Sequence, residues 1–293
     1  MSERVLVCIL AQTRAHQLTW ANFEKNVLGE LNADLAVCIG VDQQYDYDNP
    51  YFKNARFRCI IPESADYAAE IDRISVSLGH RTDWRGLLKL CEDYYSIFLG
   101  GVAGVAGAGA ILLVYRWYLR NYIAEQQLDA RYDRFIITRS DFIYAAPHPC
   151  LDAIERGSIW LPDGEDWGGL VDRHMVVNND DVIKSLSTLS DLLRNPEDWA
   201  AALAARIAPY RNIEGVLEIY FKREGLFSRV RRFPYIMYLV RGENDPTRWT
   251  EGEFDPELGL YVKYPTELEL ANQWKDRFRS QRDWLEWAAQ PPA

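Results

Sequence analysis

A charged pair follows one hydrophobic run of this chain at the point where the run ends. Residues 132–138, YDRFIIT, are followed by Arg139, Ser140 and Asp141. A buried strand has no structural need for such an ending, so Asp141 is either a turn residue or a ligand. Carboxylate oxygen is a preferred ligand of Mg²⁺ and Mn²⁺. The hydrophobic residues that follow, FIY, disfavour a simple chain reversal, but the residues alone leave both interpretations open.

Polar segments also follow two earlier hydrophobic runs. They are Gln12, Thr13 and Arg14 after residues 4–10, and Asp42 after residues 35–41. If these runs are parallel strands, their carboxyl ends meet at one edge of the sheet, where ligands of open α/β sheets bind. We therefore expect these side chains to converge with Asp141.

A third polar segment, DGEDWGGLVDRH at residues 163–174, contains several side chains that could take part in chemistry. They are Glu165, Asp166, Asp172, Arg173 and His174. A carboxylate can take a proton from a hydroxyl group. The alternative is an acidic surface loop that turns at its glycine pair. We favour a functional role because an aspartate and an arginine adjoin a predicted strand that faces the same edge.

Two further features favour structural roles. Glu214 and Glu218 lie four residues apart on a predicted helix, which is typical of a solvated face. His174 could complete a metal site, but a single histidine is more often a hydrogen-bonded structural residue.

Hydrophobic periodicity predicts the elements that would position these residues. Continuous apolar runs indicate strands at 4–10, 35–41, 56–61 and 132–138, and helical spacing follows at 17–31, 64–77, 84–98 and about 105–127. The second half reads as strands at 157–162, 174–177 and 229–240 and helices at 180–194, 212–226 and 266–287. Strands that alternate with helices predict right-handed βαβ units, so we expect an α/β fold with a mostly parallel central sheet and a mixed C-terminal half.

Composition narrows the classes of function. The chain has 293 residues, is 48% hydrophobic and carries a net charge of −10, which argues against a nucleic-acid surface. The five cysteines form no C-x-x-C pair and the N-terminus has no signal-peptide pattern, so we expect a reduced, cytoplasmic protein. The sequence lacks three motifs that mark common enzyme classes: the P-loop of P-loop NTPases, the G-x-G-x-x-G after the first strand of Rossmann dehydrogenases, and the H-E-x-x-H of zinc hydrolases. These three classes are therefore disfavoured.

Residues 97–115, IFLGGVAGVAGAGAILLVY, contain no charged side chain. Their length is close to the ~20 apolar residues of a membrane-spanning helix. Many of them are Gly or Ala, however, and the helical pattern continues past them into RWYLRNYI. We therefore favour a buried helix with a glycine-rich entry, where a ligand could approach the backbone closely.

Residues 4–180 resemble the GT-A-fold glycosyltransferases in the order of their segments. A first strand is followed by AQTR, a second strand by Asp42, and YDRFIITRSDFIY comes later in the chain. These enzymes transfer a sugar from a nucleotide-sugar donor, and most have a DxD motif at the end of a central strand. Here the motif is Arg139-Ser140-Asp141, which lacks the first aspartate and keeps the last position. The segment at 159–177 is similar to the one that follows this strand in several microbial members.

The resemblance implies a GT-A-like, Rossmann-like single domain over 1–293, with a nucleotide-sugar-binding half at 1–145 and an acceptor-side half at 146–293. It implies that Asp141 binds Mn²⁺ or Mg²⁺ on the donor diphosphate. The donor-binding residues would be Thr13, Arg14, Asp42, Arg139, Ser140 and Arg173. Asp172 would be the base of an inverting reaction, with Glu165 and Asp166 as alternatives, and Trp160 and Trp167 could stack on sugar rings.

The same resemblance implies a glycan or another hydroxyl acceptor and work in polysaccharide biosynthesis, in the cytoplasm or at the inner face of a membrane, with peripheral membrane contact. Two alternatives remain. A sugar nucleotidyltransferase would normally show a glycine-rich loop after the first strand, and AQTRAHQ has no glycine. A non-enzymatic protein anchored in a membrane by residues 97–115 is the other.

Overall fold

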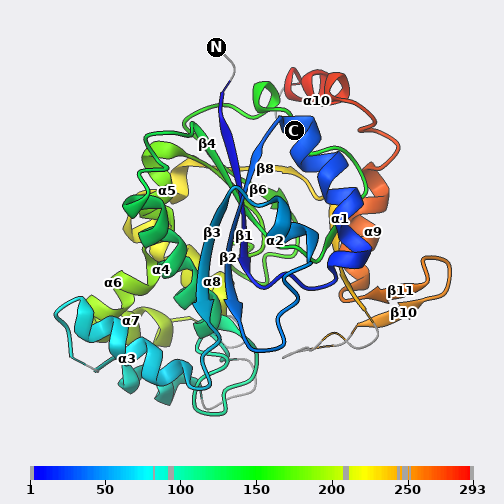
Figure 1. The fold of residues 1–293 in the computed structure, drawn as a ribbon. Helices are drawn as coiled ribbons and strands as arrows, with labels where there is room; N and C mark the ends of the chain where they lie inside the picture. Colours follow the sequence, from blue (N-terminus) through cyan, green and yellow to red (C-terminus); the bar gives the residue numbers. More distant parts are fainter. Residues whose placement is uncertain are drawn as a thin grey trace.

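A seven-stranded sheet forms the centre of the computed structural model, which describes residues 3–81, 83–91, 96–206, 211–242, 245, 250 and 252–290 (Figure 1). Its strands, in spatial order, are β3 (Phe57–Pro62), β2 (Asp34–Val41), β1 (Val5–Ala11), β4 (Arg134–Thr138), β7 (Met175–Asn178), β6 (Ile159–Asp163) and β8 (Val230–Pro234). The first four are parallel to one another, and β7 runs antiparallel to β4 and β6. This mostly parallel α/β arrangement is compatible with a Rossmann-like fold, and it confirms the predicted sheet of four parallel N-terminal strands.

Strand β1 shows why its sequence is a continuous apolar run. Leu6 and Cys8 face one hydrophobic core, while Val5 and Val7 face a second core on the other side of the sheet. A strand buried on both faces cannot alternate apolar and polar residues.

Helices cover one face of the sheet, and a mixed layer covers the other. The first face carries α3 (Tyr67–Ser77), α4 (Gly109–Glu125), α5 (Asn179–Ser185), α6 (Thr188–Arg194), α7 (Pro196–Ala204) and α8 (Ile213–Arg223). The second carries α1 (His16–Phe23), α2 (Pro50–Asn54), α9 (Pro265–Trp274), α10 (Gln281–Ala288) and a small sheet. Figure 1 shows α4 to α7 and the pair α1 and α9 on opposite sides of the strands.

The small antiparallel sheet has the order β10 (Glu253–Asp255), β11 (Leu260–Val262), β9 (Met237–Arg241) and β5 (Phe142–Tyr144). Strand β5 is the FIY segment, which was expected to resume the preceding strand. Instead the chain leaves the main sheet after Thr138, and Phe142 pairs with Leu239 of β9. Residues 139–141 therefore connect the two sheets.

Several predicted helices are shorter or divided. A π-helical turn, η1 (Glu24–Gly29), follows α1, and residues 180–194 and 266–287 each form two helices. In the last pair, α10 starts afresh because Ser280 and Asp283 form a capping box. The predicted helix at 84–98 is a 3₁₀ helix, η2 (Asp83–Cys91), and its residues 92–95 lie outside the described part of the chain. Two short 3₁₀ turns, η3 (Leu151–Ala153) and η4 (Phe227–Arg229), complete the elements.

The uncharged segment at 97–115 folds into a series of turns followed by the first two turns of α4. The turns are closed by backbone hydrogen bonds, such as Gly101 N to Val105 O at 2.9 Å. Gly107 has a left-handed φ of +85° at the last turn before the helix. Among the described residues, no helix has the length and hydrophobicity needed to cross a membrane.

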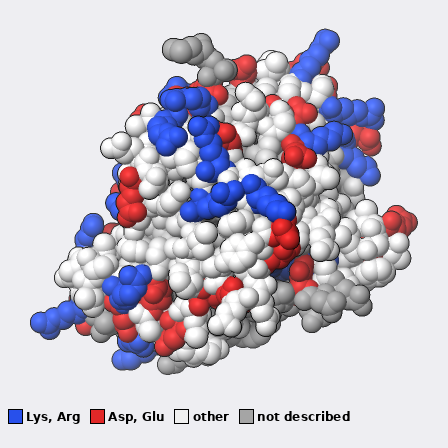
Figure 2. All heavy atoms as spheres, viewed as in Figure 1, with Lys and Arg blue, Asp and Glu red and all other residues white. Residues whose placement is uncertain are grey.

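Strand β3 forms one edge of the main sheet and carries exposed arginine. Arg58 donates to the carbonyl oxygens of Phe52 and Lys53 at 2.8 and 2.9 Å, which ties the edge to α2. Figure 2 shows a band of basic side chains across the middle of this face, over the region where β3 and α2 lie in Figure 1. Charged side chains on an edge strand disfavour pairing with another chain.

Candidate functional site

Two adjoining cavities lie beyond the carboxyl ends of β1 and β4. The first lobe is lined by residues that include Leu10, Gln12, Arg14, Glu63, Tyr67, Ile111 and Tyr115. The second lobe is lined by residues that include Trp167, Asp172, Arg173, Ile213, Glu214 and Tyr264. The lobes share Gly107, Ala108, Leu112, Arg139 and Lys263, so they form one continuous cleft. Their volumes are about 80 and 290 Å³, so the second lobe approaches the lower limit of ligand sites, roughly 300–1,000 Å³, and the first is a narrower extension of it.

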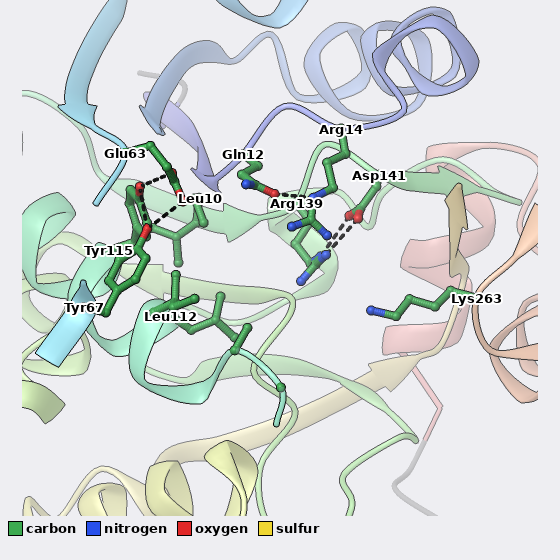
Figure 3. Close-up of a pocket in the computed structure, with 14 residues that line it drawn as sticks. Leu10, Gln12, Arg14, Glu63, Tyr67, Leu112, Tyr115, Arg139, Asp141 and Lys263 are labelled. Atoms are coloured by element: carbon green, nitrogen blue, oxygen red, sulfur yellow. Dashed lines mark hydrogen bonds and ion pairs between the residues drawn. The ribbon is translucent and has the colours of Figure 1, made fainter. Parts of the chain in front are cut away.

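A cluster of cationic side chains lies where the two lobes meet. Arg14 from the loop after β1, Arg139 from the end of β4, Arg241 from the end of β9 and Lys263 from the end of β11 surround the carboxylate of Asp141. We call these four side chains the cationic junction. Figure 3 shows Arg139 against Asp141, and Lys263 reaching toward them from the opposite side of the cleft.

Asp141 is buried and paired with two guanidinium groups. Its Oδ1 and Oδ2 accept hydrogen bonds from Nε and Nη2 of Arg139, both at 2.8 Å, and Oδ2 also accepts from Nη1 of Arg241. Burial alone would raise the pKa of Asp141, but the charges of Arg139 and Arg241 hold that pKa well below its ordinary value. The carboxylate is therefore ionised and organises both arginines.

Lys263 carries the least compensated charge of the cationic junction. Within the described residues no carboxylate lies within ion-pair distance of its Nζ, which lies 5.2 Å from the centre of the Tyr264 ring. Burial, and then repulsion from Arg139 and Arg241, lower its pKa to about 6, so its amine is mostly neutral at pH 7 in the empty cleft and would be protonated when an anion is bound. An anion bound between these groups would relieve that repulsion.

Some predicted donor-binding residues hold the loop after β1 rather than line the cleft. The hydroxyl group of Ser140 donates to the carbonyl oxygens of Gln12 and Arg14, at 3.1 and 3.0 Å. Thr13 is buried, and its hydroxyl accepts a hydrogen bond from Asn49 at 2.9 Å. Both residues fix the backbone from which Arg14 reaches the first lobe.

Asp42 lies apart from the cleft. It is exposed in the loop after β2, and its Oδ1 accepts from the backbone N–H of Gln44 at 2.9 Å, as in an Asx turn. Asp42 is absent from the lining of both lobes.

The first lobe ends in a hydrogen-bonded acid. The Glu63 carboxylate accepts from the hydroxyl groups of Tyr67 and Tyr115, at 3.0 and 3.1 Å (Figure 3). Gly40 lies against them, since a Cβ there would come within 2.1 Å of the Glu63 carboxylate and 2.0 Å of the Tyr115 hydroxyl. The apolar side chains of Leu10 and Ile111 line the same lobe, so the lobe has apolar side chains next to the Glu63 carboxylate.

The second lobe contains two neighbouring carboxyl groups. Glu214 lies in the first turn of α8 and is 9% exposed, and the charge of Asp172 acts on it. Burial, and then the charge of Asp172, raise the pKa of Glu214 to about 8. In the described chain no other side chain donates a hydrogen bond to the Glu214 carboxyl group. The expectation that Glu214 lies on a solvated face is wrong, whereas Glu218 does lie outward and pairs with Arg206 and Lys222, each at 2.6 Å.

A tight backbone contact places Glu214 beside the loop that carries Asp172. A Cβ on Gly169 would lie 2.2 Å from the backbone of Glu214, and Leu170 N donates to Glu214 O at 3.0 Å. Asn212 caps α8 through Gly215 N and donates to Trp167 O at 2.9 Å. The glycine pair of this loop therefore serves helix packing.

Arg173 lines the second lobe but is held by several acids. Its guanidinium donates to Glu267 of α9, and its Nε lies 3.5 Å from Asp172 Oδ1. Glu267 is itself buried and accepts from the hydroxyl of Tyr235 at 2.9 Å and the N–H of Leu239 at 2.8 Å. Arg173 thus fixes Asp172 in place, and sequence reasoning missed Glu267.

Glu165 and Asp166 do not line either lobe. Glu165 Oε1 accepts from Thr266 Oγ1 at 2.8 Å. Asp166 pairs with Arg232 at 2.9 Å and accepts from Val171 N at 3.0 Å, which closes the turn. Of the three predicted catalytic acids, the structure brings only Asp172 into the cleft.

The residues around Asp141 do not fit a divalent metal ion. Both oxygens of Asp141 are taken by arginine N–H groups, and the described residues contain no group of three or more His, Cys, Asp or Glu side chains with a metal-binding arrangement. A metal would also have to lie among guanidinium groups, which repel it. His174 is buried away from the cleft, with Nδ1 3.0 Å from Thr138 Oγ1 and Nε2 3.2 Å from His148 Nε2.

No protein-family model matches this chain, and no curated protein sequence matches it significantly.

Proposed function

We propose that the protein is a glycosyltransferase that uses a nucleotide-diphosphate sugar, with a GT-A-like arrangement of its α/β fold. The observation that carries the proposal is the cationic junction, which lies where the lobe that ends at Glu63 meets the lobe that holds Asp172 and Glu214, in a chain of net charge −10. The first lobe, the cationic junction and the second lobe follow one another as the nucleoside, the diphosphate and the sugar do in a nucleotide sugar.

In this proposal the nucleoside occupies the first lobe. The apolar side chains of Leu10 and Ile111 would contact the base, and the Glu63 carboxylate would accept hydrogen bonds from ribose or base donors. The diphosphate would lie at the cationic junction, within reach of Arg14, Arg139 and Lys263.

The sugar and the acceptor hydroxyl would then occupy the second lobe. The acceptor oxygen attacks the anomeric carbon, and the bond from that carbon to the diphosphate breaks, with its electron pair passing to the diphosphate. The hydroxyl proton passes to a carboxylate of this lobe, either Asp172 or the ionised form of Glu214, which becomes the major form only above about pH 8. The cationic junction stabilises the charge that develops on the leaving diphosphate. Trp167 lines the same lobe, where its ring could stack on a sugar.

A thermal-shift screen of the wild-type chain tests this function. Nucleotide sugars and nucleoside diphosphates should raise the melting temperature, and a ligand at 100 times its dissociation constant adds about 2.7 kcal/mol to the stability. Nucleoside triphosphates together with sugar phosphates are the substrates of the alternative nucleotidyltransferase. Turnover of that pair, or no stabilisation by any nucleotide diphosphate in the presence or absence of Mn²⁺, would contradict the proposal.

A further inference from the structure

We infer that the cationic junction binds the donor diphosphate without a divalent metal ion, and that Asp141 is a positioning residue for Arg139 and Arg241. This inference rests on the proposed function for the nature of the ligand. It differs from the metal-binding role that the variant motif Arg139-Ser140-Asp141 suggests.

The first support is the occupancy of Asp141. Oδ1 accepts one N–H group of Arg139 at 2.8 Å, and Oδ2 accepts a second at 2.8 Å together with Nη1 of Arg241. Two charge-assisted arginine pairs at a buried carboxylate are strong interactions. A metal ion would have to displace them and would leave two buried guanidinium groups without their counter-charge.

The second support is the lack of further ligands. Mg²⁺ is usually held by one or two carboxylates together with phosphate oxygens and water. The cleft contains three other carboxyl groups among the described residues. Glu63 lies in the first lobe and accepts a hydrogen bond from Tyr67. In the second lobe, Asp172 lies beside Arg173, and Glu214 is part of the first turn of α8.

The third support is the excess of positive charge that faces the cleft. Asp141 pairs directly with Arg139 and Arg241, and the charges of Asp172 and Asp245 act on the junction without an ion pair to it in the described part of the chain. Nε and Nη2 of Arg241 are buried with no hydrogen-bond partner among the described residues. Arg139 and Lys263 border both lobes, so a group that joins a ligand in one lobe to a ligand in the other must pass between them. A diphosphate has the charge and the length for that position.

The start of α4 adds a fourth support. Gly107, Ala108 and Gly109 line the second lobe, and Ala108, the N-cap residue of this 17-residue helix, offers no side-chain oxygen to its first amide groups, of which Ala110 N donates to Gly100 O at 3.1 Å. The N-terminus of a helix favours anions because its N–H groups and dipole point toward them. The glycine-rich entry keeps side chains out of the way at that point.

Isothermal titration with UDP, GDP and inorganic pyrophosphate, each in EDTA and in Mn²⁺, tests the inference. We expect at least one nucleoside diphosphate to bind in EDTA with a dissociation constant within about threefold of its value in Mn²⁺. Lys263→Met should weaken that binding at least tenfold. Lys275→Met, at the exposed C-terminal end of α9, should leave it unchanged.

Each alternative outcome has a distinct meaning. Binding only in Mn²⁺, or binding that Lys263→Met does not weaken, would overturn the metal-free site and leave the proposed function standing. Binding of pyrophosphate in EDTA without any nucleoside diphosphate would support the anion site and overturn the proposed function. Binding of none of the three ligands would overturn both.

If Lys263→Met loses its cooperative unfolding transition, Lys263→Gln serves as the second variant, because it removes the charge and keeps a polar end group on a side chain one atom shorter. Asp141→Asn provides an independent test. It removes the charge of the carboxylate but keeps an oxygen for Arg139, so binding in EDTA should survive within about tenfold. Binding that Mn²⁺ strengthens in wild type but not in this variant would instead identify Asp141 as a metal ligand and overturn the inference.

Discussion

Asp141 and Glu214 are both buried carboxyl groups beside the same cleft, but their neighbours carry opposite charges. Asp141 lies between two arginines, which hold its pKa well below the ordinary value against the effect of burial. Glu214 has no such partner, and burial together with the charge of Asp172 raises its pKa to about 8. When the surroundings of two acids at one site shift their pKa values in opposite directions, the two acids typically have different roles in catalysis. Under the proposed function, this difference would give Asp141 a role in charge organisation and Glu214, with Asp172, a role in proton transfer.

The largest expected effect is on stability at Asp141. Asp141→Ala leaves Arg139 and Arg241 buried without a counter-charge, which typically costs about 3–5 kcal/mol. Chemical denaturation should show this loss in the free energy of unfolding. Asp141→Asn keeps a hydrogen-bond acceptor and should lose less. A loss below about 1 kcal/mol in Asp141→Ala would show that the ion pairs do not hold this region together.

The next effect is on turnover at Glu214. Glu214→Gln should lower the release of nucleoside diphosphate from a nucleotide sugar by about 100-fold, the lower range for loss of a general base, with donor binding retained. Glu218→Gln, four residues further along α8 and absent from the lining of both lobes, is the matched control and should keep full turnover. Equal turnover in the two variants would break the proposed contrast between the acids, and a larger loss in Asp172→Asn would make Asp172 the base.

The third effect is on the pH dependence of stability. Between pH 4.5, the ordinary pKa, and about 8, folded Glu214 keeps a proton that the unfolded chain has released, so this group makes stability fall as pH rises through that window. Glu214→Gln should flatten this slope and melt at least about 2–4 °C higher than wild type at pH 8, the shift that about 1 kcal/mol produces in a domain of comparable size. Calorimetry of both proteins at pH 5 and pH 8 measures it. An unchanged slope would show that Glu214 is not protonated in the folded chain.

The smallest effect is expected at Asp42. Asp42→Asn keeps an acceptor for Gln44 N in an exposed turn, so stability should change by less than about 0.5 kcal/mol and nucleotide binding should be unchanged. A tenfold loss of nucleotide binding, measured by titration, would instead place Asp42 at the ligand, as the sequence suggested.

The sheet was predicted correctly where a continuous apolar run can be explained only by a buried strand. The runs at 4–10, 35–41 and 132–138 form β1, β2 and β4, which are covered by a layer on each face, whereas the run at 56–61 was expected to be a buried strand and forms the partly exposed edge strand β3. The helices were less well placed. Their spacing gave the buried faces, but the breaks within 180–194 and 266–287 depend on local caps that the periodicity does not reveal.

The candidate site was predicted in part. Arg14 and Arg139 line the cleft because they follow the ends of β1 and β4, and Asp172 reaches the same edge because it precedes β7, which runs antiparallel to β4. Glu214 and Lys263 were missed because they come from α8 and β11, far along the chain, and no spacing rule links them to that edge. Their part in the site follows from packing, since Gly169 lets the loop carrying Asp172 press against the start of α8.

The sequence by itself determined the parallel strands, the acidic character of the chain and the edge of the sheet at which polar side chains gather, because hydrophobic burial and strand direction follow from local patterns. Only the tertiary structure decided what Asp141 does. Its partner Arg241 lies 100 residues away in a second sheet, and the chain reaches that sheet by leaving the first directly after β4. The charge state of a buried group depends on which residues the fold places around it, and local sequence does not contain that information.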